Sequence, residues 1–386
     1  MASYLRAQAT EFLRALRRHR ESGASPNGAS PAARSATPPA PSTGHVDTAR
    51  ALRRAARRLS GTLHTFQPLL DADWAETMRP ELAWLSGTLA MEHAYASRLE
   101  RLLQALHRLS GSPSLPAPRP VTGRTAAAPV PFATPPGTSG TPGTPGTPAP
   151  PTTQPDRGNL TVGAAKAGAL LDRQLTLART RAHSTALQAL GSSRFHAVAD
   201  KVALLASEVP LRATGPLTAP AAATAADLRP LATAAKDRLA DAVAALPLVT
   251  AGSPYNAQAL VHGLSPDPSP HPQDAPWHQV RLLLRLHRYA VEVLTGAYPG
   301  ATADTGGTEG ADGCADVRLI AAGEALDRHR DASEAAAAAA QAARTPRIAP
   351  ATAYALGVLH ADQRHEVEAA RYAFQHSWRK EPVRLP

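Results

Sequence analysis

The sequence predicts an all-α protein, on three observations. Long stretches rich in Ala, Leu and Arg carry apolar residues at helical spacing, whereas no segment of useful length alternates apolar and polar residues as a half-buried strand would. Tracts rich in Pro, Gly, Ser and Thr separate these stretches and are typical of loops. We therefore expect helices joined by long disordered loops, within one domain that spans residues 1–386.

The first part of the chain contains three expected helical segments. Residues 4–20 form a short helix, and a second helix runs to about residue 70 from Asp47, whose carboxylate can cap it. A helical hairpin follows over about residues 73–109, in which Pro80 must kink or restart the helix because proline has no N–H to donate. These segments make up a first helical half, residues 1–110.

Two tracts beside these helices have the composition of linkers. Residues 22–45 are rich in Ser, Pro and Ala, and residues 111–158 include GTSGTPGTPGTPAPPTTQP. The second tract has too few apolar side chains to offset the entropy that its chain would lose on folding. We therefore expect residues 111–158 to be a disordered Pro/Gly/Thr linker.

Helices resume after this linker. The middle helices, within residues 159–247, are expected at about 160–190, 193–209 and 224–246. A Pro-, Ser- and His-rich loop then covers about 248–274. The final helical group, residues 275–380, contains expected helices at 277–294, 315–343 and 350–379, with a Gly-, Asp- and Thr-rich loop at 299–313.

The charge balance points to a polyanionic partner. The net charge is +10, which favours nucleic acid, an anionic membrane or a phosphate polymer without choosing among them. Arginine supplies most of the positive charge, and its planar fork binds phosphate with two hydrogen bonds. Lysine occurs only at Lys166, Lys201, Lys236 and Lys380.

Several functional classes lack their sequence signals. The single cysteine, Cys314, excludes an internal disulfide, and no run of about 18 apolar residues could span a membrane, so we expect a cytoplasmic protein. The sequence has no GxxxxGK[ST], GxSxG, HExxH or paired CxxC motif. An HRD triplet at residues 329–331 lacks the other elements of a kinase. We expect no catalytic residue, no metal site and no cofactor.

One helix carries an unusual thin basic stripe. Residues 277–294 read WHQVRLLLRLHRYAVEVL, and His278, Arg281, Arg285 and Arg288 fall within an arc of roughly 80° when each residue advances about 100°. Apolar side chains occupy most of the remaining surface. The stripe fits either a half-buried helix whose arginines extend to water or a packed helix whose one free face lines a cleft.

A second helix repeats the spacing. In ARALRRAARRLSGTLHTF, residues 49–66, Arg50, Arg53 and Arg57 are spaced as the first three basic residues of the other stripe, and Arg58 widens the row. The repeat indicates an internal duplication with two basic stripes that face each other. A chance match in an arginine-rich chain is the alternative.

These stretches resemble the signature helices of the CHAD domain, the conserved histidine α-helical domain. Residues 49–70 are similar to the first signature, and residues 277–294 match the second, with His278 at the position of the eponymous histidine. Residues 326–336 and 351–380 resemble two further elements of the family. The resemblance implies two pseudo-symmetric halves, each like a four-helix bundle, around a basic channel that binds inorganic polyphosphate without catalysis. With no triphosphate tunnel domain in the sequence, the chain would be a stand-alone member.

The chain departs from the family pattern in ways that make the channel less basic. Arg50 stands where the first half has a histidine, and His93–Ala94 replaces an Arg-Asp pair. Leu282 and Leu286 occupy basic positions of the second signature. These departures imply weaker polyphosphate binding, or its loss.

We expect the basic stripes to hold a linear polyphosphate, with Glu292 and Asp331 orienting neighbouring basic side chains. The expected contact residues are Arg50, Arg53, Arg57, Arg58, His278, Arg281, Arg285, Arg288 and His329. Inorganic polyphosphate, including the surface of polyphosphate granules, is the expected partner. Two alternatives stay open: a non-specific nucleic-acid binder, and a helical scaffold that docks a protein or granule surface. Facing stripes in a concave cleft would favour polyphosphate, and stripes on separate convex faces would favour the scaffold.

Overall fold

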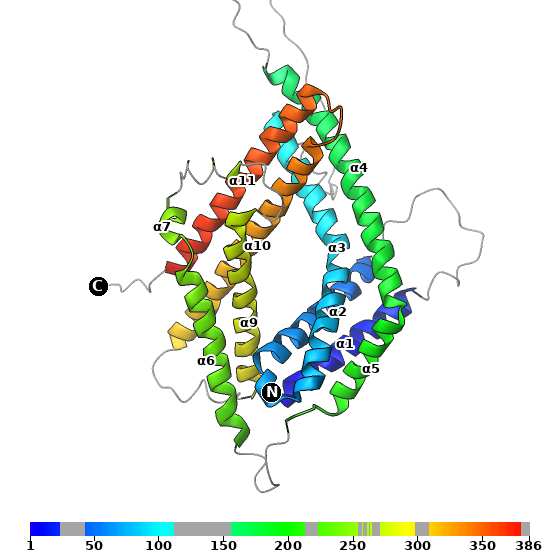
Figure 1. Cartoon of the computed structure of the whole chain (residues 1–386), viewed down its shortest axis with the longest axis vertical. Coiled ribbons are helices and arrows are strands. Elements are labelled where there is room, and N and C mark those ends of the chain that lie inside the picture. Colours follow the sequence, from blue (N-terminus) through cyan, green and yellow to red (C-terminus); the bar gives the residue numbers. More distant parts are fainter. Residues whose placement is uncertain are drawn as a thin grey trace, which may run out of the picture.

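The computed structural model describes residues 1–23, 43–111, 156–212, 223–253, 271–297 and 309–379, together with residues 257, 261, 263 and 264. Within these ranges the all-α prediction is confirmed (Figure 1): the regular elements are helices, and the β-type pairing is confined to an isolated bridge between Leu70 and Leu211. Most of the predicted linker, residues 112–155, lies outside the described part of the chain, as do most of residues 22–45. None of the described helices combines the length and the apolar character needed to cross a membrane.

The first group of helices shares one apolar core, to which its fourth helix adds only its C-terminal end. It contains α1 (Ala2–Gly23), α2 (Thr43–Thr65), α3 (Ala72–Ser110), α4 (Asp156–Leu190) and α5 (Ser193–Ser207). On α1, Leu5, Phe12 and Leu16 lie at helical spacing, and they are buried with Leu52 and Leu59 of α2. This packing fixes the face of α2 that meets α1, so the basic residues of α2 lie on its other sides.

The hairpin predicted over residues 73–109 is instead one continuous helix, α3. Its N-terminus is capped by the Asp71 carboxylate, which accepts a hydrogen bond of 2.8 Å from the Trp74 backbone N–H. Gly111 ends the helix with a left-handed φ of 68°. Pro80 costs the helix one backbone hydrogen bond, but Met78 and Leu82 on either side of it are fully buried, and this packing carries the helix through the proline.

The second group repeats the order of packing. It contains α6 (Ala223–Ala244), the short α7 (Leu248–Ala251), the 3-10 turn η2 (Pro272–Asp274), α9 (Ala275–Ala297), α10 (Glu309–Ala343) and α11 (Pro350–Arg379). Helix α6 packs on α9 as α1 packs on α2, and α10 pairs with α11 as α3 pairs with α4. The predicted loop 299–313 ends earlier than expected, because α10 already begins at Glu309. A pseudo-symmetric relation between the two groups stays a prediction.

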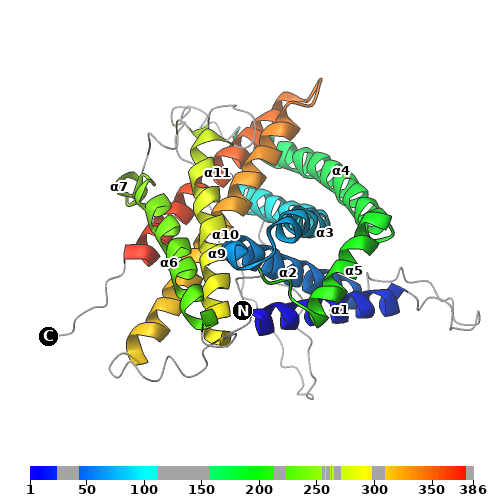
Figure 2. The ribbon, with the colours of Figure 1, turned by 60° about the horizontal axis from the view of Figure 1, so that its bottom comes forward.

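Two close helix crossings join the groups. Helix α2 packs against α9, and the two lie side by side in both views (Figures 1 and 2). Gly61 permits this approach, because a Cβ there would lie only 2.5 Å from Cδ2 of Tyr289. Helix α4 packs on α11, where a Cβ on Gly163 would lie 2.2 Å from the backbone oxygen of Ala351. The first crossing determines which side chains of the two basic helices meet.

Candidate functional site

The basic stripes of α2 and α9 converge on one region. On α2, Leu52, Ala56 and Leu59 are buried, and the half-buried Arg53 and Arg57 occupy an adjoining face. On α9, Val280 and Leu284 are buried in the same way, and the neighbouring faces carry the half-buried Arg281 and Arg285. The apolar residues thus anchor each helix and leave its arginines beside the α2–α9 crossing.

A fifth arginine joins these four. The pKa of Arg53 is lowered first by burial and then by repulsion from Arg330 of α10, Arg285 and Arg281. The five residues Arg53, Arg57, Arg281, Arg285 and Arg330 are called the arginine cluster below. Spacing could not predict Arg330, because its helix has no basic stripe and only tertiary packing brings it to α2.

Three members of the cluster form no ion pair within the described part of the chain. Among the described residues, no carboxylate forms an ion pair with Arg53, Arg57 or Arg285, and the Arg53 Nε is buried without a hydrogen-bond partner. Burial, followed by repulsion from neighbouring arginines, lowers the pKa of Arg57 to about 10 and that of Arg285 to about 10. Both remain charged at neutral pH, so the cluster holds uncompensated positive charge.

The other two members are held by carboxylates of α10. Arg281 forms an ion pair with Asp327. Arg330 donates to Glu334 at 2.7 Å, and Glu334 also binds Arg98 of α3. These pairs fix the positions of Arg281 and Arg330 while leaving the excess of positive charge on the α2–α9 side.

A pocket of about 610 Å³ opens where α2, α3 and α9 meet. Arg57 and Arg285 line it from α2 and α9, and Arg79 adds a third guanidinium from α3. Glu76 is the acidic residue among the described lining residues, and it already accepts a hydrogen bond from Gln67 at 3.3 Å. The pocket is therefore basic, concave and bounded by three helices.

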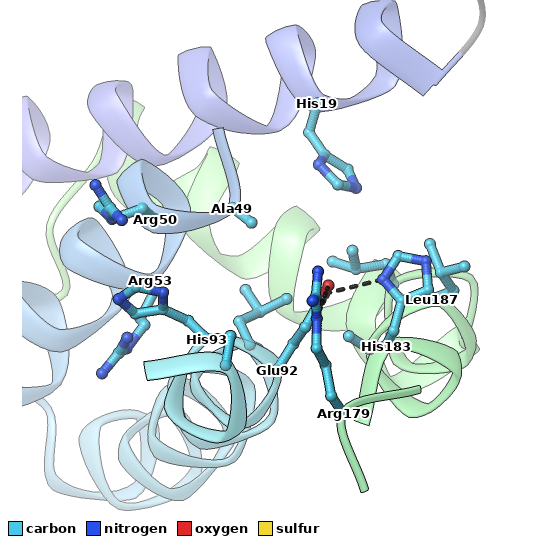
Figure 3. A pocket seen from close by; sticks show the side chains of 13 residues that line it. His19, Ala49, Arg50, Arg53, Glu92, His93, Arg179, His183 and Leu187 are labelled. Atoms are coloured by element: carbon cyan, nitrogen blue, oxygen red, sulfur yellow. Dashed lines mark hydrogen bonds and ion pairs between the residues drawn. The ribbon is translucent and has the colours of Figure 1, made fainter. Parts of the chain in front are cut away.

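A second pocket, of about 290 Å³, lies at the other end of the α2 stripe (Figure 3). Arg50 and Arg53 lie on one side of it, and His93 of α3 lies close to both (Figure 3). On the opposite side, Glu92 interacts with His183 at 2.9 Å. Arg50, one of the predicted contact residues, thus lies in the same row of α2 as Arg53 and Arg57.

His278 lies at the edge of the arginine cluster. Its pKa is lowered, first by burial and also by the nearby Arg281 and Arg330, although Asp274 and Glu334 act in the opposite direction. Its ring meets that of His329 edge to face, with 5.5 Å between the ring centroids. Of the two histidines among the predicted contact residues, His278 is therefore the one that lies next to the arginine cluster.

His329 does not belong to this surface. Its side chain is 1 % exposed, it stacks on Trp277 with 5.5 Å between centroids, and its Nε2 accepts a hydrogen bond of 3.3 Å from Arg371. Burial, then repulsion from Arg371, lowers its pKa to about 3, so the ring is neutral. The geometry assigns His329 to the core and removes it from the expected contact set.

The buried carboxylate of Asp274 organises this part of the core. It accepts hydrogen bonds of 2.7 Å from Arg364 and 2.7 Å from Arg371, and also binds Ser333. Desolvation alone would raise its pKa, but Arg364, by its hydrogen bonds and its charge, and Ser333 help to outweigh it and lower the pKa to about 2. Because Asp274 directly precedes α9, the network holds the start of the helix that presents His278 and Arg281.

Two further predicted residues are placed away from the cluster. Arg58 donates to Glu292 of α9 at 2.9 and 3.3 Å, so its charge is neutralised at the helix crossing. This pair matches the expected orienting role of Glu292.

Arg288 is exposed and lies beside α10, since a Cβ added to Gly323 would be 3.7 Å from the Nη1 of Arg288. Asp331 is near Arg330, and burial raises its pKa.

Comparisons with known proteins agree with this architecture. The sequence pattern of the CHAD domain matches residues 37–307. Among solved structures, the chain is similar to PptA from Streptomyces chartreusis, with 62% sequence identity over 98% of this chain and 98% of that chain, and a TM-score of 0.67. No curated protein matches the chain. The domain pattern covers more than half of the sequence, and this chain therefore belongs to the CHAD domain family.

Proposed function

We propose that this protein binds inorganic polyphosphate at the arginine cluster and does not turn it over. The observation that carries the proposal is the set of half-buried arginines Arg53, Arg57 and Arg285, which come from two helices and lack carboxylate partners among the described residues. A folded protein that keeps such charges together pays for their repulsion unless an anion neutralises them. A phosphate chain supplies that anion, and guanidinium groups bind its oxygens through paired hydrogen bonds.

The linear arrangement of the cations favours a linear ligand. Arg50, Arg53 and Arg57 extend along about 10 Å of α2, at 1.5 Å per residue. Arg281 and Arg285 add donors from α9, so a chain lying along α2 would be contacted from two sides. A compact anion such as a single phosphate would use only part of this row.

The walls of the site fit polyphosphate better than nucleic acid. Binding of single-stranded nucleic acid relies on aromatic platforms for base stacking. Tyr289 is the aromatic residue other than histidine among the described residues that line the two pockets, and it packs over Gly61 at the helix crossing. A polyphosphate chain presents no bases, so it needs only the basic groups. Binding to the surface of a polyphosphate granule would use the same contacts.

Calorimetric titration tests the proposal. Wild-type protein is titrated with polyphosphate and, separately, with single-stranded DNA of equal total charge at the same salt concentration. The proposal expects tighter binding of polyphosphate, unchanged polyphosphate length after incubation with or without Mg²⁺, and affinity that falls steeply with salt. Equal affinities for the two polymers would point to general electrostatics, and turnover that copurifies with the protein would overturn the non-catalytic part.

A further inference from the structure

A third pocket, of about 450 Å³, lies at the C-terminal end of α2, next to α6 and the 3-10 turn η1 (Gln67–Leu69). His64 lines both this pocket and the 610 Å³ pocket that contains Arg57 and Arg285. The two hollows therefore adjoin at one side chain of α2. None of the residues in the third pocket belongs to the arginine cluster.

The third pocket is basic in its own right. Arg212, from the segment after α5, and Arg238, from α6, line it, and no acidic residue occurs among its described lining residues. The pKa of His64 is lowered, first by burial and then by the positive charges of Arg79 and Arg238, which places those two guanidinium groups near the ring. Thr65 also lines the pocket, and its buried hydroxyl has no hydrogen-bond partner among the described residues. The pocket thus gathers cationic and hydroxyl donors from several segments of the chain.

The face of α2 that carries the basic stripe leads to this pocket. Arg50, Arg57 and His64 are seven residues apart, a spacing that returns to nearly the same face of a helix after two turns. Each step covers about 10 Å along the axis, so the row from Arg50 to His64 is about 21 Å long. An extended polyanion that lies along Arg50 and Arg57 is directed toward His64.

We propose that His64, Arg212 and Arg238 form a second anion site, which takes the continuation of a long polyphosphate beyond the arginine cluster. This inference rests on the proposed function, and it adds a chain-length preference to it. A short phosphate chain fills the cluster and ends there. A long chain also reaches the His64 pocket, gains its contacts and binds more tightly for that reason.

The test compares two ligand lengths on matched variants. Arg238→Gln removes a charge from the pocket, and Lys236→Gln removes one from an exposed position on the same helix that does not line the pocket. Affinities for tripolyphosphate and for a polyphosphate of several tens of phosphates are measured by calorimetry at one salt concentration. Arg212→Gln serves as an independent second variant, and circular dichroism verifies that each variant keeps its helices.

The inference expects Arg238→Gln to lower the affinity for the long chain about tenfold, the size of one lost charge-assisted contact, and to leave the affinity for tripolyphosphate unchanged. Lys236→Gln should change neither affinity appreciably. Equal losses for both lengths, or no loss for either, would overturn the second site while leaving the proposed function intact. If the wild type bound neither ligand, that result would instead contradict the proposed function itself.

Discussion

Arg57 on α2 and Arg285 on α9 line the same pocket, and neither forms an ion pair with a carboxylate in the described part of the chain. Burial and neighbouring cations lower both pKa values to about 10, so both groups are charged at neutral pH. The unliganded protein therefore carries the free-energy cost of holding two like charges in a partly buried site. An anion bound between them removes that cost, and the free energy released contributes to its affinity.

Replacement of one of these arginines should stabilise the unliganded fold and weaken binding. Arg285→Met keeps most of the aliphatic stem and removes the charge, so the free energy of unfolding should rise by about 1 kcal/mol, which urea denaturation measures. Titration should at the same time show at least about tenfold weaker polyphosphate binding. The control is Arg288→Met, an exposed position on the same helix, which should change neither quantity much. Stability that falls with Arg285→Met would contradict the repulsion.

The crossing of α2 and α9 should tolerate no side chain at residue 61. In Gly61→Ala the new Cβ would lie 2.5 Å from Cδ2 of Tyr289, so the ring or the helix must move, and overpacking of this kind costs about 1–3 kcal/mol. Combining it with Tyr289→Ala should remove the clash, so the double variant should lose less stability than the sum of the two single variants. Strict additivity in the denaturation series would argue against this crossing geometry.

Acid should destabilise the fold through His329. Burial, then Arg371, lowers its pKa in the folded state to about 3, whereas an exposed histidine titrates near 6.5. Between these values the unfolded chain binds the proton and the folded protein does not, so stability falls as the pH drops from about 6.5 toward 3. In His329→Gln, whose amide can still accept from Arg371, unfolding free energies at about pH 7 and about pH 5 should differ less than in the wild type. An unchanged difference would show that His329 is not the group responsible.

Binding of polyphosphate should take up protons at His278. Burial and the positive charges of Arg281 and Arg330 keep its pKa below the usual value in the free protein, and a bound polyanion would raise it. Affinity should therefore grow as the pH falls through the bound-state pKa, and level off below the free-state pKa. The ratio of affinities at about pH 5.5 and about pH 8 should be smaller in His278→Ala than in the wild type. Identical ratios would remove His278 from the site.

Helical periodicity was enough to predict which basic residues share a face of α2 and which share a face of α9. Residues three, four and seven apart share a helix face whatever the tertiary structure, so spacing alone placed Arg53 and Arg57 on one face of their helix, and Arg281 and Arg285 on one face of theirs. The helix bounds near the C-terminus were predicted for the same reason, since the helix that ends at Arg379 has a regular apolar pattern.

Properties that depend on a neighbouring helix could not be predicted from the sequence. Arg57 and Arg58 are adjacent, yet only the α2–α9 crossing decides that Arg58 meets Glu292 and Arg57 faces a pocket. His329 and Arg330 are adjacent in the same way, and the packing of α10 buries the first and delivers the second to the arginine cluster. Spacing fixes the face of a helix, and tertiary packing determines what that face meets.

The central claim is that affinity for polyphosphate resides in the arginine cluster and not in the net charge. The most direct test is a titration of polyphosphate into two double variants of equal net charge, Arg57→Gln with Arg285→Gln, and Arg6→Gln with Arg20→Gln, the latter pair being exposed on α1. Loss of two charge-assisted contacts should weaken binding by the first variant about a hundredfold or more, while the second stays within about twofold of the wild type. Equal losses in the two variants would contradict the claim.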